Sequence, residues 1–162
     1  MFRSMATIRL STHMLSDIET CFDLARSIDL HQISTAHTNE KAIAGVMHGL
    51  INLNEQVTWQ AKHFGTTRKL TSKITAFDRP FYFRDEQVEG AFKFITHDHY
   101  FEVCNDTIIM KDVFSFRSPY GVLGRLADKF ILTGYLTRLL VKRNNIIKHF
   151  AETGLWKSIL NV

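Results

Sequence analysis

Residues 91–116 have the sequence AFKFITHDHYFEVCNDTIIMKDVFSF, and this stretch decides the fold. Polar and apolar residues alternate on both sides of Asn105-Asp106, and such alternation is typical of half-buried strands. Asn and Asp side chains favour tight turns. The stretch therefore predicts an antiparallel hairpin of two strands, residues 91–103 and 107–116.

The segments before this hairpin show the same period of two. We expect strands at residues 6–12, 55–64, 69–77 and 81–88. Asp78-Arg79-Pro80 supplies turn chemistry between the last two of these strands. Consecutive strands joined by short turns predict an antiparallel meander.

After Ser118-Pro119 the apolar residues recur at helical spacing as far as Gly154, a common stop signal. This pattern predicts an amphipathic helix of about thirty residues, interrupted only by Gly134. The meander and this helix together indicate an α+β fold, in which the sheet buries its apolar face against the helix. A strongly curved sheet would leave a ligand cavity between the two.

A second helical region is expected after the first strand. Ser16 and Glu19 form a capping box that predicts a helix through about Ala25, and a second short helical piece is indicated around residues 28–30. The pattern of residues 31–54 is weak and supports no assignment.

The chain resembles the START-like superfamily, also called SRPBCC, which includes polyketide cyclases and pollen-allergen-type lipid binders. The similarity is greatest to its small stand-alone bacterial, cyclase/dehydrase-like branch and extends from Thr7 to about Glu152. The resemblance implies a helix-grip fold, a curved antiparallel sheet wrapped around a long C-terminal helix, with a cavity for lipids, sterols or polyketides. It is carried by EQVTWQAKHFG (55–65), LTSKITAFDRP (70–80), FRDEQVEGAFKFITHDHYFE (83–102) and MKDVFSFRSPYGVLGRLAD (110–128).

Length and composition indicate one globular domain, residues 1–162, with 45% hydrophobic and 22% charged residues. The first residues lack the apolar core of a signal peptide, and no apolar run approaches the ~20 residues that cross a membrane. We therefore expect a soluble cytoplasmic protein without a transmembrane segment. Cys21 and Cys104 stand apart, which favours neither a disulfide framework nor a zinc ribbon.

The net charge of +4 does not by itself indicate a nucleic-acid partner. Arg138, Lys142, Arg143 and Lys148 fall in the last turns of the expected helix, where cations interact favourably with the helix dipole. Because no nucleic-acid-binding motif accompanies them, we expect no nucleic acid to bind. A homo-oligomer is left open.

His97 and His99 are the first candidates for chemistry. Strand alternation places both imidazoles and Phe101 on the inner face, with Asp98, Tyr100 and Glu102 on the outer face. A catalytic zinc needs a third protein ligand, which would come from His63, Glu86 or Asp112. Polar lining of a partly wet pocket is the simpler interpretation, so we expect neither a metal nor another cofactor.

Acid/base chemistry is the second hypothesis. It would use His97 or His99 as one partner and Glu86 or Asp112 as the other. A buried carboxylate also needs a partner for stability alone, and we favour that explanation.

The third hypothesis is an apolar pocket with a few polar groups, which suits a hydrophobic or amphipathic small molecule. Binding of such a lipid-like or polyketide-like molecule is the function we expect. A cyclase, dehydratase or hydrolase in the same cavity is the first alternative, and a protein-interaction module is the second. The expected ligand-binding residues are Trp59, His63, Phe81, Phe83, His97, His99, Phe101, Phe114, Leu126 and Phe130.

Overall fold

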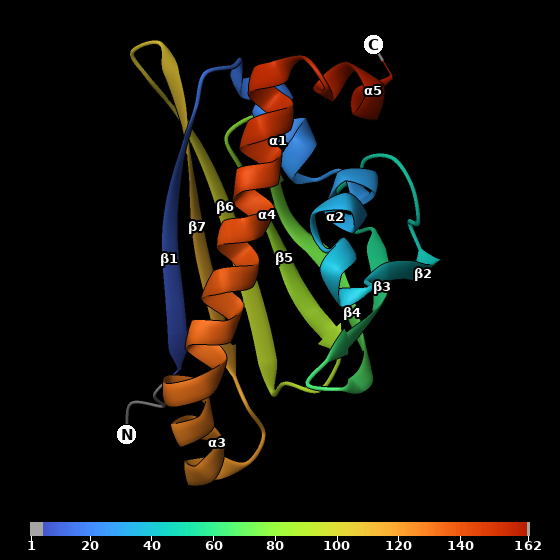
Figure 1. Cartoon of the computed structure of the whole chain (residues 1–162), viewed down its shortest axis with the longest axis vertical. Coiled ribbons are helices and arrows are strands. Elements are labelled where there is room, and N and C mark those ends of the chain that lie inside the picture. The colour runs from blue at the N-terminus through green and yellow to red at the C-terminus, as the bar shows by residue number, and fades with distance from the viewer. Residues whose placement is uncertain (1–4, 162) are drawn as a thin grey trace.

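A computed structural model describes residues 5–161 as a curved antiparallel sheet with helices on its inner side (Figure 1). The α+β helix-grip layout expected from the sequence is confirmed. The strands are β1 (Ala6–Met14), β2 (Lys41–Gly45), β3 (Gln56–His63), β4 (Thr66–Asp78), β5 (Tyr82–Glu89), β6 (Phe94–Cys104) and β7 (Thr107–Arg117). The helices are α1 (Ile18–Ala25), α2 (Ile28–Ser34), the 3₁₀ turn η1 (Ala36–Thr38), α3 (Gly121–Ala127), the π-helical turn η2 (Asp128–Leu132), α4 (Thr133–Thr153) and α5 (Trp156–Leu160).

The strand order of the sheet is β1-β7-β6-β5-β4-β3-β2, and every neighbouring pair is antiparallel. Strands β2 to β7 form the predicted meander, while β1 returns to pair with β7 at one edge. The predicted hairpin of residues 91–116 is the β6–β7 pair, although β6 begins only at Phe94.

The sheet bends where β4 meets β5. Their register shifts between Thr71 and Ser72 and again between Ile74 and Ala76. An extra residue on one strand of a pair kinks that strand and increases its twist. These irregularities accompany the curvature by which the sheet surrounds the helices.

Helices α1 and α2 cover one end of the inner face, and α4 runs along it from α3 to α5 (Figure 1). The ring of Phe22 on α1 is fully buried and packs edge-on against three other rings, with its centre 5.3 Å from the centres of Phe77, Phe83 and Phe101. These contacts attach α1 to three strands. Among the described residues, no helix is long and apolar enough to cross a membrane.

Two local expectations are corrected, and the region left without an assignment is described. The cap of α1 is Asp17 rather than Ser16, and its side chain accepts a hydrogen bond of 2.8 Å from the backbone N–H of Thr20. The region 31–54 contains the end of α2, η1 and the short edge strand β2. The irregular turn of the C-terminal helical region is η2, immediately before Gly134.

Replacing Phe22 by Ala should lower the free energy of unfolding by about 3–5 kcal/mol, because the cavity left among three aromatic rings cannot close fully. Urea unfolding followed by circular dichroism measures the loss. The matched control is Phe81→Ala, since Phe81 is 54% exposed and its removal should cost little. Equal losses in the two variants would contradict the place given to Phe22 in the core.

Candidate functional site

A cavity of about 450 Å³ lies between the inner face of the sheet and the helices α2 and α4. Its volume falls in the range of about 300–1,000 Å³ that is usual for small-molecule sites. Buried residues of two separate hydrophobic clusters line it, one centred on α1 and the other beneath Leu140 of α4. The cavity therefore separates the two parts of the core.

Most of the predicted pocket residues lie on the cavity wall, and their contact with a ligand stays a prediction. These predicted residues lie on β3 and β5–β7. The helical side of the cavity is lined by Leu132, Leu136 and Leu140, among others. The predicted residues that line the cavity are Trp59, His63, Phe83, His97, His99 and Phe114.

Four predicted pocket residues do not lie among the residues that line this cavity. Phe101 is buried, but it packs against Phe22 in the neighbouring core. Phe81 lies in the turn before β5 and is exposed, as are Leu126 and Phe130. The last two precede α4, on a stretch whose apolar side faces outward.

His97 and His99 stand at the polar wall of the cavity, each opposite a carboxylate on a neighbouring strand. In the β5–β6 register, Asp85 pairs with His97, and in the β6–β7 register, Asp112 pairs with His99. Because successive side chains alternate between the faces of a sheet, all four side chains point to the inner face. Sequence positions 85, 97, 99 and 112 thus meet in one cluster.

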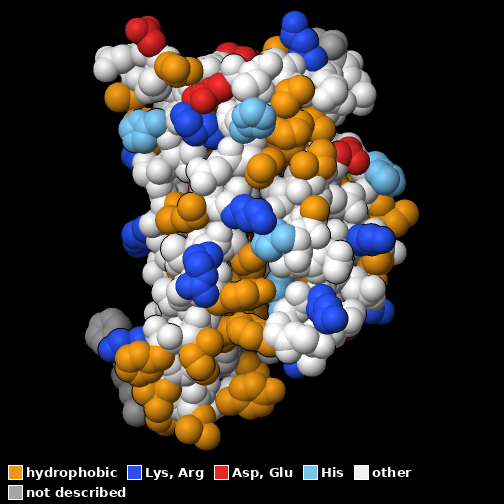
Figure 2. Space-filling view, in the orientation of Figure 1, with side chains coloured by type: hydrophobic (Ala, Val, Ile, Leu, Met, Phe, Trp, Pro, Cys, Tyr) orange, Lys and Arg blue, Asp and Glu red, His pale blue; other side chains and the backbone are white. Residues whose placement is uncertain are grey.

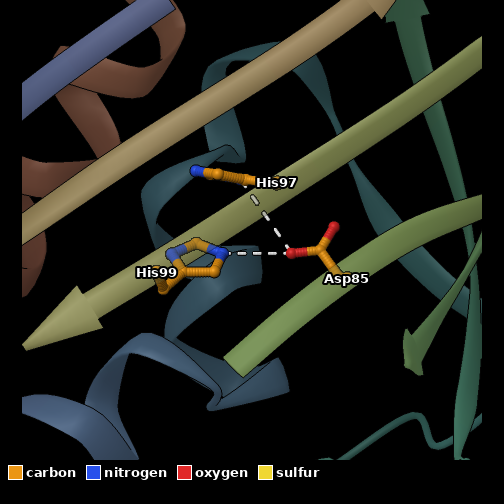
Figure 3. Close-up of side chains that lie close together, drawn as sticks. All are labelled: Asp85, His97 and His99. Atoms are coloured by element: carbon orange, nitrogen blue, oxygen red, sulfur yellow. Dashed lines mark hydrogen bonds and ion pairs between the residues drawn. The ribbon is translucent and has the colours of Figure 1, made fainter. Parts of the chain in front are cut away.

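The imidazoles lie between the two carboxylates. Nε2 of His99 lies 3.0 Å from Oδ2 of Asp85, and Nδ1 of His97 lies 3.9 Å from the same oxygen (Figure 3). On the other side, Nε2 of His97 lies 2.8 Å from Oδ1 of Asp112. Nδ1 of His99 lies 3.0 Å from that oxygen, but without the alignment of a hydrogen bond. Each ring therefore presents one nitrogen to each carboxylate.

Asp112 also connects the sheet to α4. The Asn144 side chain donates a hydrogen bond of 2.6 Å to Oδ2 of Asp112 and another, of 3.1 Å, to the hydroxyl of Thr12 on β1. Nη1 of Arg143 lies 3.7 Å from Oδ1 of Asp112, while its Nη2 donates to the backbone oxygen of Ala25. All these groups except Thr12 are buried, and a buried charge needs such partners.

The surroundings shift the pKa values of the two imidazoles in opposite directions. Burial and the charge of His99 hold the pKa of His97 below its ordinary value. Burial also acts to lower the pKa of His99, but the nearby carboxylates of Asp112 and Asp85 outweigh burial and raise it. Burial opposes ionisation of Asp112 as well, yet the two imidazoles hold its pKa well below the ordinary value. At a pH between the two pKa values, the favoured state is an imidazolium at His99 beside a neutral His97.

This charge state makes the cluster a proton-holding site at the cavity wall. With a proton on Nε2 facing Asp112, neutral His97 presents the lone pair of Nδ1 towards the side of Asp85. Asp85 is the one half-exposed member of the cluster, and its pKa is lowered by His99 and His97 against the effect of burial. A ligand in the cavity would therefore meet hydrogen-bond acceptors.

The same atoms could hold a metal ion. One ligand atom each of Asp85, His97 and His99 lies within 4.8 Å of the others, a donor set that suits zinc and other transition metals. A divalent cation would have to displace the proton between His99 and Asp85, and Arg143 adds a further positive charge to the cluster. Electrostatics therefore favours the proton as the occupant.

The acid of β5 that lines the cavity is Asp85 rather than the expected Glu86. Glu86 pairs with Thr96 and lies outside the cavity lining, whereas its neighbour Asp85 lies in it. The parity of the strand carried the correct signal, because Phe83 and Asp85 share a face and Phe83 was already expected to point inward. Asn144 was missed. Arg143 was explained by the helix dipole alone, whereas it is buried beside Asp112.

His63 belongs to a different part of the wall. Its Nδ1 lies 2.7 Å from the hydroxyl oxygen of Tyr135 on α4, and burial lowers its pKa. Nearby, the ring of His31 lies against that of Trp59 at a tilt of 31°, and His31 pairs with Glu40. His63 and His31 therefore form a second polar part of the cavity wall, apart from the cluster on β5–β7.

The fold is shared with solved structures at low sequence identity. A START superfamily protein from Mycobacterium smegmatis is 10% identical, with a TM-score of 0.68, over 91% of this chain and 99% of that one. The Zhui aromatase/cyclase from a Streptomyces species is 12% identical, with a TM-score of 0.68, over 91% and 94%. Major latex-like protein 151 from Panax ginseng is 15% identical, with a TM-score of 0.66, over 91% and 97%.

No protein-family model matches the sequence, and no curated protein matches it either. Identities in this range establish a common fold and nothing further. The structural neighbours confirm the helix-grip fold predicted from the sequence.

The two imidazoles should titrate on opposite sides of pH 6.5, the ordinary histidine value, with His99 above and His97 below. The contribution of His99 to folding stability is present below pH 6.5 and is lost as the pH rises through its raised pKa. His97 contributes with the opposite sign, so its contribution is lost as the pH falls below 6.5. Histidine NMR shifts recorded against pH measure both values.

Asp112→Asn tests the cause of the separation. Loss of this carboxylate should lower the pKa of His99 and cost about 3 kcal/mol of stability, since it leaves buried charges unpaired. The matched control is Glu102→Gln on the outer face of β6, where the lost pair with exposed Lys111 should cost at most about 1 kcal/mol. Two imidazoles that titrate together near the ordinary value in the wild type would contradict the cluster.

Proposed function

We propose that the protein binds an amphipathic small molecule, lipid-like or polyketide-like, in the cavity between sheet and α4. The apolar part of the molecule would lie among Leu, Ile and Phe side chains, and its polar end would meet the cluster at Asp85. The observation that carries the proposal is the cavity itself, which is mostly apolar and has a partly exposed charged cluster in its wall. Isolated polar groups in an apolar pocket fix a ligand's orientation.

The protonation of the cluster narrows the chemistry of the polar end. Asp85 is an acceptor because its pKa is lowered, and neutral His97 offers a lone pair on Nδ1. A hydroxyl group suits this position, since it donates a hydrogen bond and brings no charge. A free carboxylate would face the negative charge of Asp85, so a sterol-like or phenolic molecule fits better than a fatty acid.

A second candidate is an enzyme that uses the same cluster for acid/base chemistry. One observation favours it: His99 and His97 touch, with ring centres 3.8 Å apart, and their pKa values are shifted in opposite directions. Groups separated in this way can serve as acid and base. Such a pair also arises as the stabilising partner of a buried carboxylate, and that is why binding remains the first proposal.

Comparison of co-purified molecules separates the two candidates. Wild type and His97→Gln are produced in the same host, and the molecules released by organic solvent are identified by mass spectrometry. A binding protein should carry molecules of the same mass in both forms. An enzyme should carry product in the wild type and substrate in the variant, for instance with a mass difference of one water for a dehydratase.

Filling the cavity should abolish binding without unfolding the chain. Ala61 on β3 is buried and lines the cavity, so the added ring of Ala61→Phe would occupy ligand space. We expect the wild type to show a bound small molecule in native mass spectra and the variant to show at least tenfold less. Thermal unfolding of the variant checks that the fold persists.

The matched control is Ala44→Phe on the edge strand β2, where the side chain is exposed and lies outside the cavity lining. This variant should retain the molecule at the wild-type level. A folded wild type that carries no molecule and binds none from an organic extract of its host would overturn the proposed function.

A further inference from the structure

The largest group of exposed apolar side chains lies where the chain enters the C-terminal helical region. These side chains, called the apolar patch below, cover α3 and η2 at the lower end of the molecule (Figure 2). Exposed apolar residues scattered singly are ordinary, but a contiguous group marks an interaction surface. The apolar patch consists of Tyr120, Val122, Leu123, Leu126, Phe130 and Ile131, which are 50–76% exposed.

The helical segment formed by α3 and η2 is reversed compared with a usual surface helix, because its apolar side faces solvent. Val122, Leu126 and Phe130 are spaced by four residues and therefore form one outward stripe. The buried side instead carries Asp128, whose carboxylate accepts hydrogen bonds from the backbone N–H and the hydroxyl of Ser118. A helix in water normally buries its apolar stripe and exposes its charges. The buried hydrogen bonds of Asp128 with Ser118 therefore keep the apolar stripe on the solvent side of this segment.

The exposed charges along the helical region that carries the apolar patch have a single sign. Asp128 is the only acidic residue from position 113 to 151, and it is buried. Exposed Lys129 lies within the patch, and exposed Arg138 and Lys142 follow it along the helix. In Figure 2, Lys and Arg side chains lie above the patch, whereas acidic side chains gather towards the opposite end.

The apolar patch is continuous with the mouth of the cavity. Tyr120 belongs to both, and Leu132, immediately after the patch, also lines the cavity. A strip of apolar side chains runs upward from the patch between the helix and the rest of the molecule (Figure 2). Beside it, the exposed ring of Phe64 at the β3–β4 turn contacts Tyr135, and Arg68 and Lys69 follow on β4.

We propose that this end of the molecule docks onto a membrane surface that contains anionic lipids. The apolar patch would enter the interface between headgroups and acyl chains, and the cations behind it would meet lipid phosphates and carboxylates. Amphipathic helices with basic flanks bind membranes in this way, without crossing them. Docking would bring the mouth of the cavity against the lipid, where an amphipathic molecule could enter.

A second copy of the chain suits the surface less well. A symmetric dimer places the same surface on both sides of the interface, so Lys129 and Arg138 of each copy would approach the cations of the other. Residues 113–151 offer no exposed acid to pair with them. An anionic lipid surface supplies both the apolar layer and the opposite charge.

Vesicle flotation tests the docking directly. The full chain is mixed with vesicles of phosphatidylcholine, either alone or with added phosphatidylserine, and the bound fraction is measured after centrifugation. The wild type should float with the vesicles that contain phosphatidylserine, and added salt should reduce binding. Lys129→Ala should weaken binding to those vesicles about fivefold.

Leu123→Asp should weaken binding at least tenfold, because it places a charge where the apolar patch enters the lipid. The matched control is Val103→Asp, since Val103 is equally apolar and exposed but lies in the β6–β7 hairpin at the opposite end. Both substitutions are at exposed positions, and circular dichroism checks their folding.

Three outcomes would overturn docking: no flotation of the wild type, equal flotation of Leu123→Asp and Val103→Asp, or a dimer that only Leu123→Asp dissociates. The last result would assign the surface to a second copy. Docking does not depend on the cavity being filled, so Ala61→Phe should float like the wild type. Failure of ligand binding and failure of docking are therefore separate results.

Discussion

The contacts of the Asp112 carboxylate hold the sheet and α4 together. This carboxylate is fully buried, and a buried charge is tolerated only with partners. His97 and His99 provide them from β6, and Asn144 and Arg143 provide them from α4. One group therefore joins the sheet to the long helix at the level of the cavity.

The same carboxylate determines the chemistry of the cavity wall. It contacts one nitrogen of each imidazole, and the other nitrogen of each ring is directed towards Asp85. The same carboxylate therefore contributes both to the position of α4 and to the polarity of the cavity wall. Packing this volume with apolar side chains would be the simpler route to stability, and the retained space and charges support the proposed binding of a small molecule.

Much of the fold was predictable, because strand alternation and helical spacing are local signals. The β6–β7 hairpin, the meander and the inward direction of His97 and His99 followed from side-chain parity alone. Asp85 could have been found in the same way, from its parity with Phe83. Asn144 and Arg143 could not, because their role depends on how α4 is rotated and how far it stands from the sheet.

The outward direction of Leu126 and Phe130 was equally hidden. Apolar residues at helical spacing normally predict a buried stripe, and the expectation that these two line the pocket rested on that rule. The buried hydrogen bond between Ser118 and Asp128 turns the polar side of this helical segment inward and its apolar side outward. The spacing of apolar residues in the sequence does not reveal such a hydrogen bond. Residues that depart from the rule of a buried apolar stripe are expected at functional surfaces.

A crystal structure of the protein, purified without organic solvent, tests the central claim most directly. We expect elongated electron density for a bound molecule in the cavity, with the polar end of that molecule within hydrogen-bond distance of Asp85 or Nδ1 of His97. A cavity closed by inward movement of α4, or density that avoids the cluster altogether, would contradict it.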